Sequence, residues 1–405
     1  RGITLDLGYA YADDGRLGFI DVPGHERLVH NMLAGATGID FVLLVAAVDD
    51  GPMPQTREHL AIVDLLGLAR GALVLTKVDA VSPDRRVAAK AEIAALTAGT
   101  FLEHARLFEV SAVTGEGIDA LRAFLVAEAA RGATRTAAGG FRLAIDRCFT
   151  LRGIGLIVTG TAHSGQLSVG DTVTVSPPGV TARVRGLHAQ DRAVQTGIAG
   201  ERLAINLAGD IAVEAILRGM WVTSPVLCVP VSRFHARLRV FAGERAPLMH
   251  WTPLHAHIGA TDVTGRVALL EGEALAPGES MLVEILTDRP IGAFWGDRFI
   301  VRDQSATRTL GGGRVLDIFP PLRYKRARDR LEFLRLLEHT DPRPALHDAL
   351  RRQSAGVDLD RYALNRNLSG AQARELWQEM ALVVVEAGAT HVGFSAENWN
   401  ALREA

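Results

Sequence analysis

The chain has 405 residues, enough for about three domains of ordinary size. Hydrophobic residues make up 48% of it and charged residues 22%, a balance that excludes an intrinsically disordered chain and allows buried cores. With 44 basic and 46 acidic residues, the overall charge excludes a general polyanion binder, so any contact with nucleic acid must come from a local patch.

The cysteines and the apolar runs indicate the cellular compartment of the protein. Cys148 and Cys228 are the two cysteines of the sequence, too few for a disulfide framework or a thiolate zinc site. The longest apolar run, FVLLVAAV at 41–48, is too short to span a bilayer, and the sequence shows no signal peptide. We therefore expect a cytoplasmic protein that does not bind a membrane.

Residues 17–130 alternate short apolar runs with helical patterns. The runs LGFIDV, FVLLVAAV, GALVLT and LFEVS are typical of buried parallel strands. Between them, residues 56–68 and 117–131 carry apolar side chains at helical spacing. Strands that alternate with helices predict a doubly wound α/β domain, whose functional groups lie at the carboxyl ends of the strands.

The pattern changes to short alternating strands after a small, polar linker, TRTAAGG at 134–140. Frequent glycines and turns such as VGDTV predict one small β-barrel from Phe141 to about Leu227. A second barrel is expected from about Val231 to Ile318.

The C-terminal part begins after PPLRYKRARDR, residues 320–330, a basic and proline-led break. Residues 356–380 fit helix, turn and helix, and residues 383–394 fit a two-stranded hairpin. This order is typical of a winged-helix α+β domain.

The motif DVPGHE at 21–26 follows the first predicted strand. Asp21 in this position can hold a hydrated Mg²⁺, and after Pro23 the backbone of Gly24 can approach a terminal phosphate without obstruction by a side chain. His25 is then placed to orient an attacking water. Alone, the motif also fits an ordinary strand-to-helix turn.

The motif TKVD at 76–79 follows the strand GALVLT. Asp79 can accept two hydrogen bonds from the edge of a guanine base, and the stem of Lys77 can lie across the ring. Lysine is rare in this sequence, with Lys90 and Lys325 as the other two, and its use here fits a need for a slim stem.

The motif SAVTGEG at 111–117 follows the next strand, where the backbone of Ser111 and Ala112 can contact the guanine carbonyl. Each of the three motifs alone also fits a turn at a strand end. Their occurrence together, in this order and at these strand ends, predicts a site for a guanine nucleotide.

RGIT, DVPGHE, TKVD and SAVTGEG together resemble the switch and base-recognition motifs of translational GTPases. The resemblance implies GTP and Mg²⁺ as cofactors, with Thr4 and Asp21 serving the metal and His25 serving hydrolysis triggered by the ribosome. Thr76 stands where the usual N-K-x-D motif has asparagine. A G-x-x-x-x-G-K-[ST] phosphate loop does not occur in the sequence, so we expect a chain truncated inside the first switch that binds GTP poorly by itself.

Within the translational GTPases, the chain resembles the selenocysteine-specific elongation factors, the SelB family. The resemblance rests on GYAY after RGITLDL, IDRCF, GERLAINLAG, TKVD in place of N-K-x-D, and the C-terminal winged-helix pattern. It implies a partial GTP-binding domain at 1–133, a barrel that binds aminoacyl-tRNA at 137–228, a second barrel at 231–320 and a winged-helix domain at 326–405. The implied partners are selenocysteinyl-tRNA, the ribosome, and an mRNA SECIS hairpin bound by further winged helices that this chain would lack.

The same resemblance implies a selenocysteine pocket formed by Tyr9, Asp146, Arg147 and Arg202. A selenol is a stronger acid than a thiol, so selenocysteine is an anion at neutral pH whereas serine is neutral. Two guanidiniums favour such an anion, most strongly where water is excluded. Asp146 either holds the arginines in place or contacts the amino group, and by itself the arginine pair also fits an ordinary ion pair.

Other features fit less specific roles. His255 and His257 alternate along one strand without a third ligand nearby in sequence, which favours barrel histidines over a metal pair. The basic run at 323–330 fits either RNA contact or a solvated linker. Two other functions stay open, which are another EF-Tu-like translational GTPase and a non-hydrolysing tRNA-binding or scaffold protein.

Overall fold

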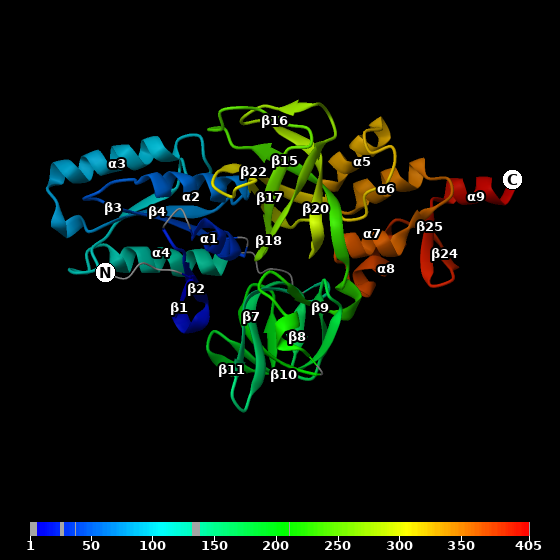
Figure 1. Cartoon of the computed structure of the whole chain (residues 1–405), viewed down its shortest axis with the longest axis horizontal. Coiled ribbons are helices and arrows are strands. Elements are labelled where there is room, and N and C mark those ends of the chain that lie inside the picture. Colours follow the sequence, from blue (N-terminus) through cyan, green and yellow to red (C-terminus); the bar gives the residue numbers. More distant parts are fainter. Residues whose placement is uncertain (1–5, 25–27, 37, 132–137, 210, 405) are drawn as a thin grey trace.

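We describe the protein from a computed structural model, which describes residues 6–24, 28–36, 38–131, 138–209 and 211–404. An α/β part and a helical C-terminal part lie on opposite sides of the second barrel, and the first barrel lies beside all three (Figure 1). Among the helices in the described ranges, none is long and apolar enough to cross a membrane.

The α/β part contains a parallel sheet covered by helices on both faces. Its strands, in spatial order, are β3 (Val42–Ala47), β4 (Gly71–Thr76) and β5 (Arg106–Glu109). The helices are α1 (Val29–Ala36), α2 (Pro54–Leu65), α3 (Pro83–Thr97) and α4 (Ile118–Arg131). Ile62 of α2 and Ile93 of α3 belong to the core on one face, and Phe124 of α4 packs on the other. This arrangement confirms the doubly wound α/β prediction.

The strand predicted at LGFIDV differs from the prediction in its partner. It forms β2 (Leu17–Asp21), which pairs antiparallel with β1 (Gly8–Ala12) in a separate two-stranded sheet. The short turn at Asp13–Gly15 brings the two strands together, and their residues are only partly buried. The expectation of a buried parallel strand was therefore wrong, because within the described residues the local hairpin supplies its ladder partner.

The first barrel is a closed ring of six strands with an added edge. Its strands are β6 (Arg142–Leu151), β7 (Gly155–Ser164), β9 (Thr172–Ser176), β10 (Val180–Ala189), β11 (Arg192–Val194), β13 (Arg202–Ala208) and β14 (Trp221–Thr223). The order is β11-β10-β13-β7-β6-β14-β9, and β9 also pairs with β10, which closes the ring. β8 (Gln166–Ser168) and β12 (Thr196–Ile198) form a small separate pair.

The second barrel is closed in the order β15-β20-β18-β17-β21-β22. These strands are β15 (Pro230–Val240), β17 (Pro253–Ile258), β18 (Thr261–Leu269), β20 (Ser280–Gly292), β21 (Arg298–Asp303) and β22 (Thr309–Asp317). β16 (Leu248–Met249) and β19 (Ala274–Leu275) pair beside it. Alternate residues of each strand point inward, and Phe234 and Phe299 meet edge to face in the core.

The C-terminal part contains the predicted helices and hairpin. Its elements are α5 (Arg328–Leu337), α6 (Arg343–Arg352), β23 (Val357–Asp358), α7 (Leu359–Asn365), α8 (Gly370–Glu379), β24 (Val383–Ala387), β25 (Thr390–Phe394) and α9 (Ala396–Glu404). The Ser369 side chain accepts from the Gln372 amide and caps α8. Assignment of this part to the winged-helix class stays a prediction, as do the domain boundaries.

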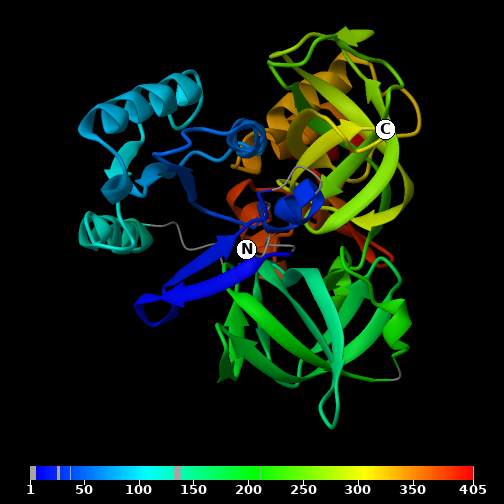
Figure 2. The ribbon, with the colours of Figure 1, turned by 60° about the vertical axis from the view of Figure 1, so that its left-hand side comes forward.

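Polar contacts join the parts. Arg142 of β6 forms a two-bond ion pair with Asp297, at 3.0 and 2.6 Å, and both side chains are buried between the barrels. Arg239 of β15 donates to the carbonyl of Asp64 in α2 at 3.0 Å. The β1–β2 hairpin lies beside the first barrel (Figure 2), and this placement creates one of the two candidate sites.

Candidate functional site

The first candidate site consists of the segments that follow β2, β4 and β5, which we call the nucleotide edge. Asp21 is the last residue of β2 and is exposed. Pro23 is buried behind it, and a Cβ added to Gly24 would meet nothing within 4 Å, so its backbone is open to a ligand. The predicted Thr4 and His25 lie outside the described residues.

The loop after β4 presents Lys77 and Asp79 to solvent. Lys77 has φ +60°, a conformation uncommon for a residue with a side chain, and its Nζ lies 2.7 Å from Oδ2 of Asp49. The hydrogen bond from Lys77 holds the pKa of the Asp49 carboxyl below its ordinary value. Thr76 donates only a long bond of 3.5 Å to the carbonyl of Ala46.

The loop after β5 is organised around Ser111, which is fully buried. Its Oγ accepts from the backbone amides of Val113 and Thr114, at 3.2 and 3.1 Å. Its own amide donates to the carbonyl of Glu116 at 2.9 Å, whereas the neighbouring Ala112 is exposed. The serine thus shapes the turn, and its amide is already used within the loop.

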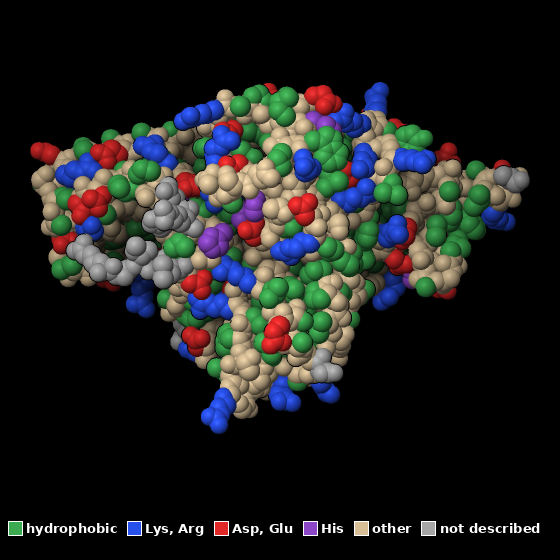
Figure 3. Space-filling view, in the orientation of Figure 1, with side chains coloured by type: hydrophobic (Ala, Val, Ile, Leu, Met, Phe, Trp, Pro, Cys, Tyr) green, Lys and Arg blue, Asp and Glu red, His purple; other side chains and the backbone are tan. Residues whose placement is uncertain are grey.

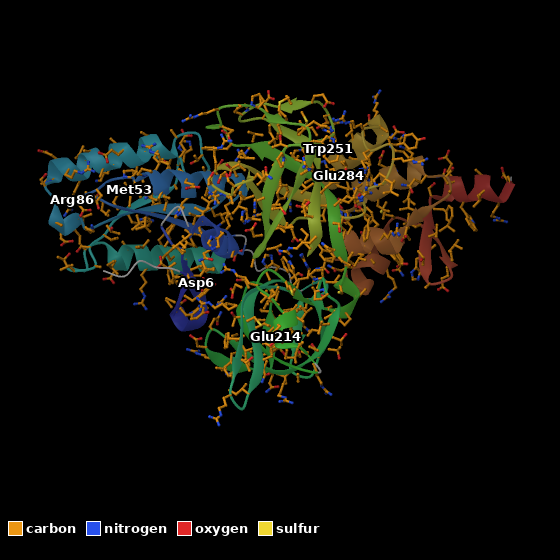
Figure 4. The ribbon with its side chains drawn as sticks, viewed as in Figure 1. Asp6, Met53, Arg86, Glu214, Trp251 and Glu284 are labelled. Atoms are coloured by element: carbon orange, nitrogen blue, oxygen red, sulfur yellow. The ribbon has the colours of Figure 1, made fainter. Side chains whose placement is uncertain are left out.

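Arg86 of α3, labelled in Figure 4, joins the two loops of the nucleotide edge and was missed from the sequence. Its Nε donates to the carbonyl of Val78 at 2.9 Å, and its Nη1 lies 2.8 Å from Oε1 of Glu116. The loop after β4 and the loop after β5 therefore hold a fixed spacing. Arginine is so common in this chain that nothing in the sequence marks Arg86.

The second candidate site, which we call the barrel pocket, is a network between β1 and the first barrel. The Tyr9 hydroxyl donates to Oδ2 of Asp146 at 3.1 Å, and Arg202 forms two bonds with the same carboxylate. The Arg202 guanidinium also stacks 3.5 Å from the centre of the Tyr9 ring. The structure thus brings together three of the four predicted pocket residues in direct contact.

Thr159 completes the network. Its hydroxyl donates to Oδ1 of Asp146 at 2.7 Å and accepts from Nη2 of Arg202 at 3.0 Å. The pairing of β6 with β7 skips Asp146 at a bulge between Ile145 and Arg147, which releases its carboxylate from the regular alternation. Neither Thr159 nor the bulge that brings it to Asp146 was predicted from the sequence.

Burial shifts the pKa values of the pocket. Burial, followed by the charge of Asp146, raises the pKa of Tyr9 far above its ordinary value of 10.0. Burial lowers the pKa of Arg202, but the hydrogen bond and charge of Asp146 outweigh it, so the net shift is upward. At neutral pH, Tyr9 is therefore a neutral donor and Arg202 is a cation.

Arg147, the fourth predicted residue, faces a different carboxylate. Its Nε lies 3.1 Å from Oδ2 of Asp6, and its Nη2 donates to the carbonyl of Leu7 at 2.7 Å. Its guanidinium carbon lies 5.6 Å from the centre of the Tyr9 ring. Arg147 and Arg202 thus flank Tyr9, and both line a cavity of about 320 Å³ between β1 and the barrel.

The histidines and the basic run have structural partners. His255 Nδ1 lies 2.9 Å from Oδ1 of Asp262, and burial lowers the pKa of His257 to about 4. Most cations of the run are paired with carboxylates, in the pairs Lys325–Glu284, Arg326–Glu273, Arg328–Glu332 and Arg330–Asp317. Figure 3 likewise shows basic and acidic side chains mixed over one face of the molecule. These pairs favour a linker fixed to the second barrel over a free RNA-binding strip.

Comparison with family models identifies the class. The elongation factor Tu GTP binding domain matches residues 1–131, and elongation factor Tu domain 2 matches residues 155–223. The β-barrel domain of the selenocysteine-specific elongation factor matches residues 235–322. With the doubly wound part and the two barrels, these matches give the chain the domain architecture of the elongation factor Tu class.

Comparison with curated relatives identifies the family within this class. The selenocysteine-specific elongation factor of Escherichia coli (strain K12) is 43% identical over 383 residues, which cover 94% of this chain and 60% of the relative. That of Desulfomicrobium baculatum is 41% identical and covers 78% of this chain and 50% of the relative. The chain belongs to the family of selenocysteine-specific elongation factors, and it spans half to three fifths of the length of these relatives.

Solved structures share the fold. A bacterial selenocysteine-specific elongation factor, EF-Sec, aligns with a TM-score of 0.79 at 24% identity, over 99% of this chain and 65% of that one. SelB from Methanococcus maripaludis, in complex with the GTP analogue GppNHp, aligns with a TM-score of 0.69 at 23% identity, over 78% and 74%. At 23–24% identity, these structures show that the fold is shared and nothing beyond the fold.

Proposed function

We propose that the protein delivers selenocysteinyl-tRNA to the ribosome at recoded UGA codons and hydrolyses GTP there. The observation that carries this proposal is the barrel pocket, where two guanidiniums flank a neutral tyrosine beside a cavity. Arg147 and Arg202 offer an anionic selenolate two charged donors that a serine hydroxyl uses far less well. Family membership supports the role in tRNA delivery, and the positive charge of the pocket would select selenocysteine over serine.

At the nucleotide edge, Lys77 and Asp79 bind the guanine, and Thr76, Ser111 and Ala112 complete its loops. Because the Ser111 amide is already bonded within its loop, the amide of Ala112 is the better donor to the base carbonyl. Asp79 is exposed and can accept from the guanine edge.

The phosphate end of the nucleotide edge uses the residues of the two switches. Gly24, after Pro23, leaves its backbone open to the terminal phosphate. Asp21 and Thr4 would hold Mg²⁺, partly through water, and the exposed carboxylate of Asp21 fits this hard cation. The metal neutralises phosphate charge when bound, and His25 orients the attacking water.

In the barrel pocket, Asp146 positions Arg202 and receives the Tyr9 hydroxyl. Its 7% exposed carboxylate makes both bonds to Arg202, so it fixes the plane of that guanidinium. This contact supports the first of the two roles considered for Asp146, which is to hold an arginine in place. Tyr9 covers the guanidinium face and excludes water from it.

The remaining partners follow from the family. The ribosome would trigger hydrolysis at His25, and an mRNA SECIS hairpin would recruit the factor through winged helices. α8 (Gly370–Glu379), the candidate recognition helix of the C-terminal part, carries one arginine and two glutamates, a poor surface for phosphate. We therefore assign no RNA contact to this helix.

The test compares the binding of one tRNA that carries either selenocysteine or serine. Arg202→Ala should weaken binding of selenocysteinyl-tRNA by about 100-fold, because a charge-assisted contact in a partly buried site is lost, and should change seryl-tRNA binding little. Arg185→Ala, at an exposed arginine on β10 of the same barrel, is the matched control. Equal loss of both tRNAs would remove the selenolate pocket and favour another EF-Tu-like GTPase or a general tRNA-binding protein.

A further inference from the structure

Asp6, which follows Thr4 by two residues in the sequence, sits at the junction of two arginines. Its Oδ2 lies 3.0 Å from Nη2 and 3.1 Å from Nε of Arg147, and its Oδ1 lies 3.8 Å from Nη1 of Arg218. Figure 4 labels Asp6 beside the β1–β2 hairpin, between the α/β part and the first barrel. One carboxylate thus faces two guanidiniums that both come from the barrel.

The two arginines of the barrel pocket differ in how firmly their counter-ions are held. Asp146, the partner of Arg202, is 7% exposed and is bonded by three side chains. Asp6, the partner of Arg147, is 45% exposed, and Arg147 itself is 42% exposed. A half-exposed ion pair contributes little net free energy, whereas a buried one is costly to break. An incoming anion can therefore replace Asp6 far more easily than Asp146.

Arg147 keeps an anchor when its carboxylate leaves. Its Nη2 donates to the carbonyl of Leu7 at 2.7 Å, and its guanidinium lies beside the Tyr9 ring. Both contacts are independent of the Asp6 carboxylate. The guanidinium thus stays oriented toward the cavity while its Nε and part of its charge become available.

We propose that Asp6 is the exchangeable counter-ion of Arg147 and a specificity-determining residue of the barrel pocket. A selenolate takes the place of the Asp6 carboxylate, so that one anion replaces another and Arg147 remains neutralised. A serine hydroxyl cannot replace a carboxylate in this way, so Asp6 stays on Arg147 and the neutral ligand gains nothing from that arginine. This inference rests on the proposed function.

The experiment measures equilibrium binding of selenocysteinyl-tRNA and seryl-tRNA to the 405-residue chain under reducing conditions, without nucleotide. Asp6→Asn should raise the affinity for selenocysteinyl-tRNA about five-fold, the size expected when a half-exposed ion pair no longer competes. The affinity for seryl-tRNA should stay the same. Asp13→Asn is the matched control, because it removes the same charge from the adjoining hairpin, at a carboxylate paired with Arg16.

A double-mutant cycle locates the effect. In an Arg147→Gln background, Asp6→Asn should give no gain, because the cation that the carboxylate neutralises is absent. An equal gain for both tRNAs, a gain that persists in that background, or no gain would each overturn the exchange. If the wild-type chain instead binds the two tRNAs equally well, the proposed function is overturned, and this inference with it.

Discussion

The barrel pocket and the nucleotide edge hold their charged groups in opposite ways. In the pocket, Asp146 and Arg202 are 7% and 14% exposed and satisfy each other before any ligand arrives. At the edge, Lys77 is 51% exposed and pairs with Asp49, which is 39% exposed, and Asp21 and Asp79 are exposed as well. The charged groups of the barrel pocket are therefore buried, whereas those of the nucleotide edge are exposed to solvent.

This difference in burial suggests how each site would select its ligand. Buried charges are expensive to assemble but keep a fixed geometry, so an arginine that Asp146 already orients can distinguish an anion from a neutral group. Exposed groups depend on the ligand for most of their partners, and their geometry comes from the backbone. Lys77 at φ +60° and the turn around Ser111 are the fixed parts of the nucleotide edge.

The largest expected contrast is in stability. Arg202→Met should lower the free energy of unfolding by about 3 kcal/mol, because it leaves a buried carboxylate with only hydroxyl partners. Lys77→Met, which breaks an exposed pair, should leave the free energy of unfolding nearly unchanged. Urea unfolding of the two variants beside the wild type measures both effects, and equal losses would contradict the comparison.

A double variant separates the lost attraction from the stranded charge. Arg202→Met combined with Asp146→Leu should recover most of the stability lost by Arg202→Met alone, because no unpaired buried carboxylate remains. If the double variant is as unstable as the single one, packing around Tyr9 rather than charge holds the pocket together.

A smaller contrast should appear at alkaline pH. Tyr9 has a raised pKa, so the folded state keeps its phenolic proton where the unfolded chain, with an ordinary value of 10.0, releases it. The stability that this proton provides is present below pH 10 and is lost as pH rises above 10, by about 1.4 kcal/mol per pH unit. Tyr9→Phe should remove this part of the slope in urea unfolding between pH 9 and pH 11.

The control for this slope is Tyr324→Phe, since the Tyr324 side chain is 83% exposed. It removes one phenol without touching the pocket. If Tyr324→Phe flattens the alkaline slope as much as Tyr9→Phe does, the slope does not originate in the pocket.

Local patterns predicted much of the fold. The apolar runs at GALVLT and LFEVS became β4 and β5, and the helical spacing at 117–131 became α4 with nearly the same bounds. LGFIDV was misassigned because its partner, β1, is set by a hairpin turn rather than by its own apolar pattern. An apolar run indicates a strand but does not reveal which strand will pair with it.

The candidate sites show the same limit. The motifs at the nucleotide edge are contiguous, so sequence reasoning predicted Asp21, Lys77 and Asp79 as site residues. It did not predict Arg86, which reaches the loops after β4 and β5 from a helix. In the pocket, the family resemblance supplied four residues, while Asp6 and Thr159 depend on how β1 meets the barrel and on the bulge in β6. These contacts join residues of different elements, or depend on a bulge, so no contiguous motif in the sequence marks them.

The smallest expected effect concerns the backbone of Lys77. Lys77→Gly relieves the left-handed strain at φ +60° but adds freedom to the unfolded chain, so the free energy of unfolding should change by no more than about 0.5 kcal/mol. Lys90→Gly, in the middle of α3, should cost about 1 kcal/mol, because glycine weakens a helix interior and no strain is relieved there. Urea unfolding measures both variants.

The same variant tests what the strain at Lys77 is for. Lys77→Gly should weaken guanine-nucleotide binding while leaving stability nearly constant, because it removes the side chain that we propose crosses the base. A stability loss as large as that of Lys90→Gly would mean that the Lys77 side chain serves the fold. The nucleotide edge would then resemble the barrel pocket, with its charges held for the structure as well as for the ligand.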